Sequence, residues 1–316
     1  MAAIQENIST ATRIENILGP KKDRYCSNGF RNVRFSFANI AFSDSVLNGN
    51  VCVDFSKKWS SKKDDRQMPH LGTTEYVSIS ILLTELYLRL SMGFGSRDIA
   101  VSWVKQVRLK SMPEINRESI QPFHIRKQNE DDRQSAFKIV IGHMLMYVII
   151  AHPLKHVQTV DPYFNFADYL CGLHKNFHYN GYREINHDVH NVQINPVGYE
   201  ASGDILLQPA MNKFNGIGSA YYPTMDIASF ILVSGQLIQA LLYNLDNMRR
   251  EDSGNMWLRS LDIRYPSPLP PDNLTEHIRC ETFKKIPLKG QIWRVADIAM
   301  CMGNIEATFN MTHQIQ

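Results

Sequence analysis

The chain lacks the long apolar run that a membrane-spanning helix needs. Its longest such run in 316 residues is IVIGHMLMYVII, over 139–150, whereas a bilayer requires about 20 residues. This run is rich in β-branched residues and predicts a buried strand instead. The first residues are polar and mixed in charge, which argues against a secretory signal. We therefore expect no membrane association and a cytoplasmic location.

Cysteine is scarce and scattered, and several catalytic motifs are missing. The five cysteines form no CxxC pair, so we expect free thiols in a reducing compartment and no disulfide framework. No GxSxG, P-loop or GxGxxG sequence occurs. Their absence excludes the usual signatures of serine hydrolases, P-loop proteins and dinucleotide-binding proteins. We predict no cofactor.

The charge pattern and the histidines narrow the functional classes further. The net charge is +3, with 21% charged and 44% hydrophobic residues, as in a globular protein without a nucleic-acid footprint. Four histidines gather in LHKNFHYNGYREINHDVH, at His174, His178, His187 and His190. Their spacing fits no strong ligand pattern, so we predict no metal site.

An internal duplication runs through the chain. Trp103 in SWVKQVRLKSMP and Trp257 in MWLRSLDIRYPSP begin similar segments 154 residues apart, and Gly49 and Gly203 keep the same spacing. The triplet His-Ile-Arg occurs at 124–126 and again 153 residues later. Several matches in one order, at nearly one offset, indicate a repeated unit.

One long apolar segment lies between these landmarks in each half. MPHLGTTEYVSISILLTELYLRLSMG, at 68–93, predicts a buried helix, and GFGSRD after it predicts the helix stop. The second copy is SAYYPTMDIASFILVSGQLIQALLYNL, at 219–245. An offset of 151 pairs similar residues of the two copies: Glu75 with Asp226, Thr73 with Thr224, Ser78 with Ser229, and Glu85 with Gln236.

Each unit shows the same order of predicted elements: a strand, a second strand after a glycine, a polar loop, a buried helix and three long strands. One helix wrapped by an antiparallel sheet of five or six strands is the hot-dog arrangement. We therefore predict an α+β protein with a double hot-dog fold, a pseudo-dimer within one chain, and leave further homodimerisation open. The expected parts are a first repeat at 1–150, a linker helix and loop at 151–186, and a second repeat at 187–316.

In enzymes with this fold, the site lies where the units meet, beside the N-terminus of the buried helix. Unpaired N–H groups and a partial positive charge there polarise a thioester carbonyl and stabilise an oxyanion. The spacing of His70 and Glu85 resembles the loop histidine and helix glutamate of β-hydroxyacyl-carrier-protein dehydratases, which meet across units. Two crossed sites are therefore expected: His70 with Asp226 and Gln236, and Tyr221 with Glu75 and Glu85.

Each of these candidates also has a purely structural interpretation. Glu75 and Asp226 can stabilise the first helical turn. A carboxylate at Glu85 among leucines must be paired, protonated or facing a cavity. Gln236 can be a satisfied core amide, or can bind an acyl carbonyl or a water. His70 can simply belong to the loop, although histidine is the side chain best suited to proton transfer near neutral pH.

Two segments, ILGPKKDRYCSNGF at 17–30 and MPHLGTTEY at 68–76, together with the overall length, resemble the AvrD family of plant-pathogenic pseudomonads and related bacteria nearly end to end. The duplicated pattern is more distantly similar to AfsA-type γ-butyrolactone synthases. The resemblance implies a bacterial enzyme that makes syringolides, acyl-sugar lactone elicitors linked to avirulence. The implied reaction transfers a β-ketoacyl group from a carrier-protein or CoA thioester to a hydroxyl of a sugar such as xylulose. Intramolecular condensation then closes a butenolide.

On this basis we predict roles for individual residues. His70 is the expected base, with Asp226 orienting it or sharing its proton, and Glu85 and Gln236 are expected to contact the sugar or the β-keto group. The predicted catalytic set is His70, Asp226, Glu75 and Glu85. The predicted substrate-binding set, which includes an oxyanion site at the N–H groups of its first members, is Gly72, Thr73, Thr74, Tyr221, Tyr222, Thr224 and Gln236.

Two other functions stay open. A hot-dog dehydratase or thioesterase acting on acyl-carrier-protein or acyl-CoA substrates would use the same fold and overlapping residues. A non-catalytic acyl-binding or effector protein would not need the acidic residues and the histidine near the helix starts. Of the two crossed sites, we expect the one that contains His70 to be active.

Overall fold

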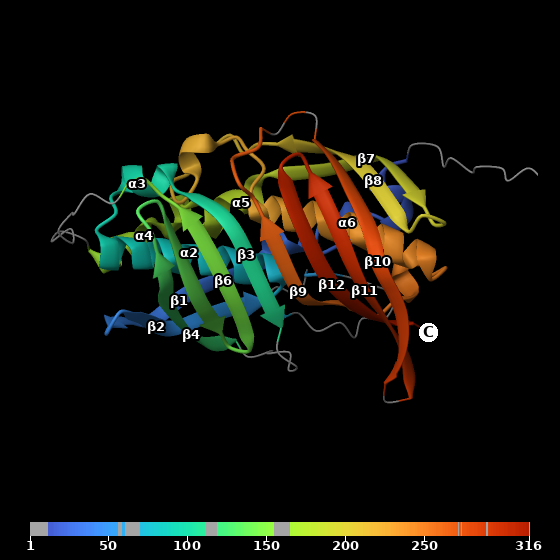
Figure 1. Ribbon diagram of the computed structural model, residues 1–316, viewed down its shortest axis with the longest axis horizontal. Coiled ribbons are helices and arrows are strands. Elements are labelled where there is room, and N and C mark those ends of the chain that lie inside the picture. The colour runs from blue at the N-terminus through green and yellow to red at the C-terminus, as the bar shows by residue number, and fades with distance from the viewer. Residues whose placement is uncertain are drawn as a thin grey trace, which may run out of the picture.

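The computed structural model describes residues 12–55, 59–60, 70–111, 119–154, 165–270, 272, 274–288 and 290–315. One antiparallel sheet of 12 strands curls around two long helices (Figure 1). In the first half the strands are β1 (Val33–Ser43), β2 (Val46–Phe55), β3 (Trp103–Ser111), β4 (Ile120–Glu130), β5 (Gln134–Ile141) and β6 (Met144–Ala151). In the second half they are β7 (Asn186–Asn195), β8 (Glu200–Gln208), β9 (Met256–Arg264), β10 (Leu274–Leu288), β11 (Gln291–Met302) and β12 (Ile305–Ile315).

The helices are two long ones and several short ones. The α-helices are α1 (Ile14–Leu18), α2 (Thr73–Met92), α3 (Ser96–Val101), α4 (Phe166–Gly172), α5 (Tyr182–Glu184) and α6 (Ile227–Leu245). The remaining single turns are η1 (Lys21–Asp23), η2 (Gly29–Asn32), η3 (Leu173–Lys175), η4 (Phe177–Gly181), η5 (Ser219–Tyr221) and η6 (Arg250–Asp252).

The strand order of the second repeat is the reverse of the strand order of the first. The sheet reads β1-β2-β4-β5-β6-β3, then β9-β12-β11-β10-β8-β7, so each strand of the first half has its counterpart at the mirrored place in the second. β3 and β9 meet in the centre (Figure 1). Each half wraps one long helix, and the predicted double hot-dog fold is confirmed.

The register of the central strand pair makes the two halves symmetric. Arg108 stands opposite Asp262, which is 154 residues further along the chain. On either side, Val107 faces Ile263 and Leu109 faces Leu261, so each pair is the exchanged copy of the other. An exchange of this kind is the pattern of a two-fold, isologous interface. A pseudo-two-fold axis therefore passes between Arg108 and Asp262, and each repeat completes the edge strand of the other.

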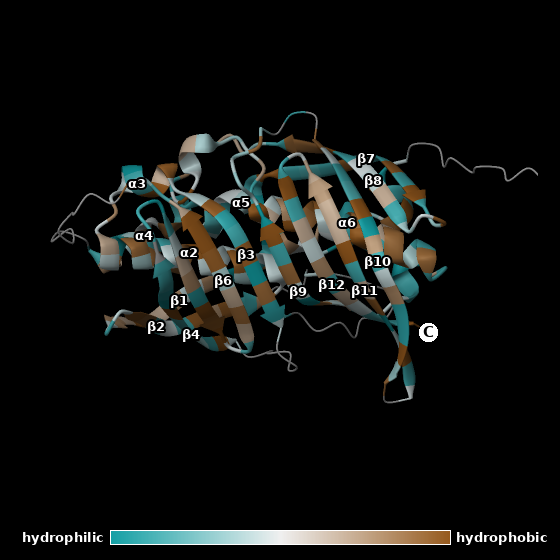
Figure 2. Cartoon of the chain, in the orientation of Figure 1, coloured by the Kyte–Doolittle hydropathy of each residue, from teal (hydrophilic) through white to brown (hydrophobic). Residues whose placement is uncertain are grey.

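Both long helices are buried because they are apolar on nearly every side. In Figure 2 they lie behind a sheet whose strands alternate between hydrophilic and hydrophobic residues. α6 is long and apolar enough to cross a bilayer, but 83% of the apolar window is buried inside the protein, as expected of a core helix. α2 ends at Gly93, which adopts the left-handed conformation with φ 67°, so the predicted helix stop is confirmed.

The two helices align at an offset of 154, and the offset of 151 predicted from their residue types is wrong. α2 begins at Thr73 and α6 at Ile227, so their N-caps, Gly72 and Asp226, are the equivalent pair. Glu75 therefore corresponds to Ser229, one helical turn from the pairing expected. Similar side chains one turn apart produced the error, because a helix brings i and i+3 onto the same face.

The run at 139–150 is also different from the single buried strand predicted. β5 ends at Ile141 and β6 begins at Met144, so the run is a hairpin. Gly142 has φ 53°, which permits the tight turn between them. Both strands are inner strands of the sheet, which explains why apolar residues continue through the turn. Each helix is consequently followed by four strands rather than three.

The opening segment of each repeat lies on the helix of the other repeat. Residues 14–27 pack on α6, where Arg24 donates to the Oε1 atom of Gln236 at 2.9 Å. The corresponding turn η4 packs on α2, next to Asn176, whose amide donates to Glu85 at 2.9 Å. The described part of the segment predicted as a linker, 165–185, thus contains the opening elements of the second repeat.

One buried carboxylic acid lies inside the second repeat, away from any cavity. Glu276 of β10 is fully buried and accepts a hydrogen bond from the Ser234 hydroxyl of α6. Its Oε2 atom has no hydrogen-bond partner among the described residues. Burial raises its pKa to about 8, so the folded protein holds this proton at neutral pH.

This raised pKa predicts a pH dependence of stability. Between about pH 4.5 and pH 8 the folded state binds one more proton here than the unfolded state, so the free energy of unfolding falls by about 1.4 kcal/mol per pH unit over that range. The stabilisation is fully present below this range and is lost as pH rises through the folded pKa. Glu276→Gln should remove that slope and stabilise the protein at pH 8, measured by urea unfolding across the range. Glu306→Gln, at an exposed position of β12, is the control, and an unchanged slope in Glu276→Gln would contradict the prediction.

Candidate functional site

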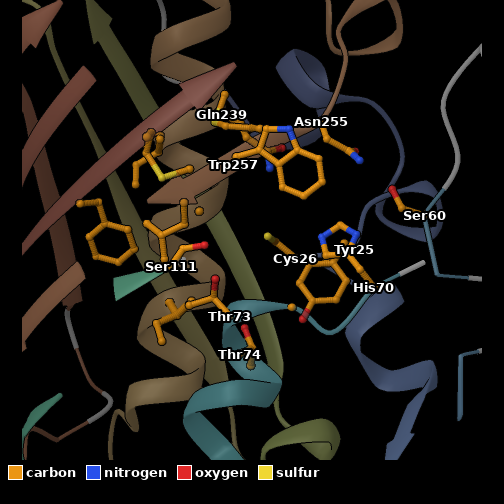
Figure 3. Close-up of a pocket in the computed structure, with 18 of the residues that line it drawn as sticks. Tyr25, Cys26, Ser60, His70, Thr73, Thr74, Ser111, Gln239, Asn255 and Trp257 are labelled. Carbon is orange, nitrogen blue, oxygen red and sulfur yellow. The ribbon is translucent and has the colours of Figure 1, made fainter. Parts of the chain in front are cut away.

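A cavity of about 200 Å³ opens beside the N-terminus of α2 (Figure 3). Its walls come from both repeats: the start of α2, the middle of α6, the start of β9 and the inner face of β12. The N-terminal segment and residues 59–60 close one side. A site at the interface of the two repeats, at a helix start, is the position that the sequence predicted.

The start of α2 presents unpaired backbone groups to this cavity. Its N-cap is Gly72, which has no side chain to cap the helix. Thr73 and Thr74 follow, and both line the cavity. Neither N–H group has a hydrogen-bond partner within the described part of the chain, so both are available to a ligand oxygen at the positive end of the helix. A side chain at Gly72 would lie 2.7 Å from the Glu75 Oε2 atom and collide with Tyr25, which explains the glycine.

Glu75 and Tyr25 form a buried pair just behind this helix start. The Tyr25 hydroxyl and the Gly72 N–H, at 3.0 Å, both donate to the Oε2 atom of Glu75. Burial raises the pKa of Glu75 and holds the pKa of Tyr25 well above its ordinary value. Tyr25 lines the cavity, whereas Glu75 does not. Glu75 thus supports the site from behind, as the structural interpretation of this residue allowed.

His70 lies between two tryptophans at the wall of the cavity. Its ring centroid is 4.6 Å from that of Trp59 and 5.0 Å from that of Trp257, which belongs to the second repeat. Tyr25 extends the aromatic wall, with its ring 5.1 Å from Trp59. Both contacts are tilted, with interplanar angles of 60° and 37°, and together they restrict the orientation of the imidazole. A residue of one repeat and a strand residue of the other thus meet across the interface.

Both polar and apolar side chains line the cavity. The polar ones include Gln239, Asn255, Ser60 and Arg250, and the first three are labelled in Figure 3. The large apolar ones are Met144, Ile231, Met256, Phe309 and Met311. A ligand that has both polar and apolar parts matches this lining.

The pseudo-symmetric position beside α6 is closed. Only about 30 Å³ remains there, which has room for no more than a few waters. The Asp226 side chain caps the helix by accepting from the Ser229 N–H at 2.9 Å, so this helix start has no free cap position. Phe177 and Tyr222 fill the space in front of it. The protein therefore has one open and one closed site on equivalent frames.

Several residues predicted to meet His70 lie elsewhere. Asp226 belongs to the closed site, where burial raises its pKa. Gln236 faces the opening segment of the first repeat, because its Oε1 atom accepts from Arg24 at 2.9 Å and from Ser27 at 2.8 Å. It is the satisfied core amide of the structural interpretation. The structure does not bring His70, Asp226 and Gln236 together.

Glu85 also lies outside the open cavity. Its Oε1 atom accepts from Arg89 at 3.1 Å and its Oε2 atom from Asn176 at 2.9 Å. Both carboxylate oxygens are thus occupied, and the side chain is 1% exposed. Glu85 joins α2 to the opening segment of the second repeat, so its position does not support the predicted contact with substrate.

The remaining predicted binding residues divide between the two sites. Tyr221 is 39% exposed, and its hydroxyl donates to the carbonyl of Val101 at 2.9 Å. The Tyr222 hydroxyl donates to the carbonyl of Ala210, and the Thr224 hydroxyl to that of Leu269. Tyr222 and Thr224 line the closed site, whereas Tyr221 lies outside it with its ring edge-on to Trp103. Gly72, Thr73 and Thr74 line the open one, as predicted.

Gln239 is the cavity residue that the sequence prediction missed. At the observed offset of 154 it is the counterpart of Glu85, and it lines the open cavity with His70. The spacing of Trp103 and Trp257 carried the signal, since the same 154 applied to the helices would have identified it. Tyr25 and Trp59 could not be found this way, because loop residues follow no periodic pattern.

The cysteines and histidines do not form a metal-binding group in the part of the chain that the structure covers. Burial raises the pKa of Cys26, which lines the cavity, to about 11, so this thiol is protonated at neutral pH. His178 bonds to the carbonyl of Ile217 and His187 to the hydroxyl of Ser229. No set of three His, Cys, Asp or Glu side chains converges among the described residues.

Two six-stranded units, each wrapped around a buried helix and joined edge to edge through β3 and β9, define a double hot-dog protein. The chain belongs to the Pseudomonas avirulence D protein (AvrD) family, whose model matches residues 10–315. No curated protein matches it in sequence.

Three solved structures with a similar chain path are distant from this chain in sequence. The 12:0-ACP thioesterase from Umbellularia californica is 9% identical, with 85% of this chain and 93% of that chain covered and a TM-score of 0.46. The acyl-CoA thioesterase II TesB2 from Mycobacterium marinum is 7% identical, with 87% of this chain and 94% of that chain covered and a TM-score of 0.41. The dehydratase domain of RzxB from Pseudomonas fluorescens is 12% identical, with 88% of this chain and 98% of that chain covered and a TM-score of 0.38.

The positions of Glu85 and Gln239 lead to opposite expectations for their variants. Glu85→Ala leaves Arg89 and Asn176 without a buried partner and should lower the free energy of unfolding by about 3 kcal/mol, while ligand affinity in the cavity stays unchanged. Gln239→Ala should lower ligand affinity with little effect on stability. Urea unfolding and quenching of tryptophan fluorescence by an acyl-pantetheine ligand measure the two quantities. Loss of binding in Glu85→Ala at wild-type stability would contradict this assignment.

Proposed function

We propose that the protein uses the open cavity to transfer a β-ketoacyl group from a carrier-protein or CoA thioester to a hydroxyl of a sugar such as xylulose. In a second step at the same site, it closes the butenolide ring of a syringolide-like elicitor. One observation supports this most: His70 and the start of α2, whose N-cap is a glycine, line the same cavity, and its other lining residues include polar, aromatic and apolar side chains. The reaction implied by the AvrD resemblance needs these features together.

The thioester would bind with its carbonyl oxygen toward the start of α2. The N–H groups of Thr73 and Thr74 are available there, and the helix adds a partial positive charge. Both stabilise the oxyanion that develops when the carbonyl is attacked. Glu75 holds this helix start in place because its Oε2 atom accepts from both the Tyr25 hydroxyl and the Gly72 N–H. The acyl chain would then extend toward the methionines that line the cavity.

In the first step His70 acts as the base. Its imidazole removes the proton from the sugar hydroxyl, the oxygen attacks the thioester carbonyl, and the C–O bond forms as the C–S bond breaks. The imidazolium returns its proton to the departing thiolate, so the products are the β-ketoacyl ester and the free thiol. A positioned histidine of this kind suits proton transfer near neutral pH.

The second step uses the methylene between the two carbonyls of the new ester. Its proton is acidic because both carbonyls stabilise the carbanion, and His70 is the base within the cavity. The carbanion attacks the sugar ketone to form a C–C bond, and loss of one water gives the ring double bond. The start of α2 again stabilises the negative charge on the ester oxygen.

The polar groups around His70 favour a transferase over a thioesterase or dehydratase. A hydrolase needs only water as its acceptor, and a dehydratase needs no acceptor. Gln239, Asn255 and Ser60 offer several hydrogen-bonding groups in the cavity that Trp257 also lines, which suits a polyhydroxylated acceptor. A protein that only binds an acyl chain would also not require the aromatic clamp on His70.

Replacing His70 provides the direct test. His70→Ala should lower sugar-dependent release of thiol from a β-ketodecanoyl thioester by at least about 100-fold, because His143, the other histidine among the described lining residues, follows β5 and does not belong to the segment before α2. Thiol release and mass spectrometry of the lactone measure the two steps with xylulose as acceptor. His174→Ala, at an exposed position, is the matched control and should match the wild type.

The same assay separates the competing functions. Thiol release that requires the sugar supports the transferase, whereas equal release without sugar indicates a thioesterase. Binding of the thioester with no release under either condition indicates a non-catalytic acyl-binding protein. Wild-type turnover by His70→Ala would show that the base is a different group.

A further inference from the structure

The Tyr25 hydroxyl lies at the start of α2, inside the proposed site. It donates to the Oε2 atom of Glu75, and a Cβ atom added at Gly72 would lie 2.3 Å from the hydroxyl oxygen. Tyr25 lines the cavity, and Figure 3 shows its hydroxyl directed toward the start of α2. The hydroxyl is therefore beside the N–H groups of Thr73 and Thr74, where a substrate carbonyl would bind.

A substrate has room at this helix start because a serine stands where the closed site has a tyrosine. In the closed site Tyr265 is fully buried, and its hydroxyl donates at 2.6 Å to the carbonyl of Met225, the residue before the N-cap of α6. Ser111 lies 154 residues earlier, at the equivalent place in the symmetric register of β3 and β9. In Figure 3 it lies beside Thr73. The shorter side chain leaves the start of α2 open to a ligand.

Glu75 can hold or release a proton at this position. Burial is the larger effect and raises the pKa of its carboxyl group, which favours the neutral acid. The hydrogen bond from Tyr25 and the positive charge of Arg183 lower the pKa and favour the carboxylate. These opposing effects keep both protonation states within reach during a reaction.

The hydrogen bond between Tyr25 and Glu75 can carry a proton in either direction. When Glu75 is ionised, the phenol donates to it. When Glu75 is neutral, the carboxyl group donates to the phenol oxygen, and the phenol O–H is then able to donate to a substrate in the cavity. Burial holds the pKa of Tyr25 well above its ordinary value, so a free phenolate is unfavourable and the two protons must move together.

The opening turns of the two repeats have the same backbone pattern. In each turn a glycine N–H bonds to the carbonyl five residues earlier, from Gly29 to Arg24 and from Gly181 to Asn176. An asparagine precedes the glycine in both turns. The turns therefore align at an offset of 152 residues.

The closed site lacks both members of the pair. At the offset of the turns, Phe177 stands where the open site has Tyr25, and it lines the closed site without a hydroxyl group. At the offset of the long helices, Ser229 corresponds to Glu75. A pair required by the fold alone would be expected in both repeats. This pair accompanies the open cavity, which points to a role in what the cavity does.

We propose that Tyr25 is a catalytic residue of the ring-closing step, in which it passes protons between Glu75 and the substrate while His70 acts as the base on the methylene. The inference rests on the proposed function for the identity of the reaction. It goes beyond that function by assigning the group that protonates the ketone oxygen when the C–C bond forms.

The protons balance over this step. His70 takes the first methylene proton, the C–C bond forms, and the ketone oxygen receives the proton of Tyr25 while Glu75 replaces it. His70 is then an imidazolium and Glu75 a carboxylate. In the elimination the imidazolium protonates the departing hydroxyl, which leaves as water. Glu75, again through Tyr25, takes the second proton from the same carbon, so both residues end neutral, as they began.

The test measures ring closure separately from acyl transfer. The full-length protein is given the β-ketodecanoyl ester of xylulose, the product of the first step, and lactone formation is followed by mass spectrometry with the uncatalysed rate subtracted. Thiol release from the thioester in the presence of xylulose measures the transfer. Tyr25→Phe should lower lactone formation by at least about 100-fold, the usual contribution of a positioned proton donor, with thiol release within about 3-fold of the wild type.

A second variant removes the proton and keeps the structural contact. Glu75→Gln retains an oxygen that can accept from the Gly72 N–H, but its amide cannot supply a proton to Tyr25. It should show the same split between the two assays. Tyr179→Phe is the matched control, because the Tyr179 hydroxyl donates to the carbonyl of Phe35 at 2.8 Å, and it should match the wild type in both assays.

Other outcomes would overturn the inference. An equal loss of both steps in Tyr25→Phe and Glu75→Gln would mean that the pair only supports the helix start. Unchanged ring closure would mean that a different group protonates the ketone oxygen. Thermal unfolding shows whether each variant is folded, and Glu75→Gln decides the question if Tyr25→Phe does not fold.

The two assays also separate this inference from the proposed function. Sugar-dependent transfer by the wild type, with ring closure unchanged in both variants, would reject the role of Tyr25 and leave the proposed function intact. A wild-type protein that neither releases thiol with xylulose nor closes the ring of the supplied ester would reject the proposed function and this inference together.

Discussion

The pairing of β3 with β9 is the interaction on which the rest of the structure depends. It joins two six-stranded sheets into one and leaves neither with an open central edge. The symmetric register about Arg108 and Asp262 places each repeat so that its inner strand faces the helix start of the other. A shift of one residue would turn every inward side chain of the pair outward. The position of Trp257 beside His70 therefore depends on main-chain hydrogen bonds some distance from the cavity.

The same frame supports a site in one place and a plug in the other because of a few side chains. Where α2 has Gly72, α6 has Asp226, so one helix start is uncapped and the other is satisfied by its own residue. Ser111 and Tyr265 differ in the same sense, one leaving space and one filling it. Side chains that fill a cavity stabilise the folded protein, and an open site lacks this stabilisation. Each of these differences is local and leaves the strand register untouched.

Much of the architecture could be predicted from the sequence, since repeats and apolar periodicity are properties of the chain itself. The spacing of Trp103 and Trp257 indicated the duplication, and the two apolar runs predicted the buried helices. The helix register was harder, because an acid three positions into one helix and an acid at the cap of the other are similar in type and one turn apart. Because the predicted offset was one helical turn too short, Glu85 was paired with Gln236 and not with Gln239. Of the two tryptophans beside His70, Trp59 lies outside the helices and strands, and its position depends on tertiary contacts.

The fusion of the two units has a genetic consequence. In a dimer of identical chains every substitution is made twice, so a bulky residue that closes one active site closes both. Here the codon for Tyr265 is separate from that for Ser111, so a mutation in one codon changes only one side of the pseudo-two-fold axis. Duplication thus permits the two sides of the axis to carry different side chains on equivalent strands and helices, so that one side can be filled while the other stays open.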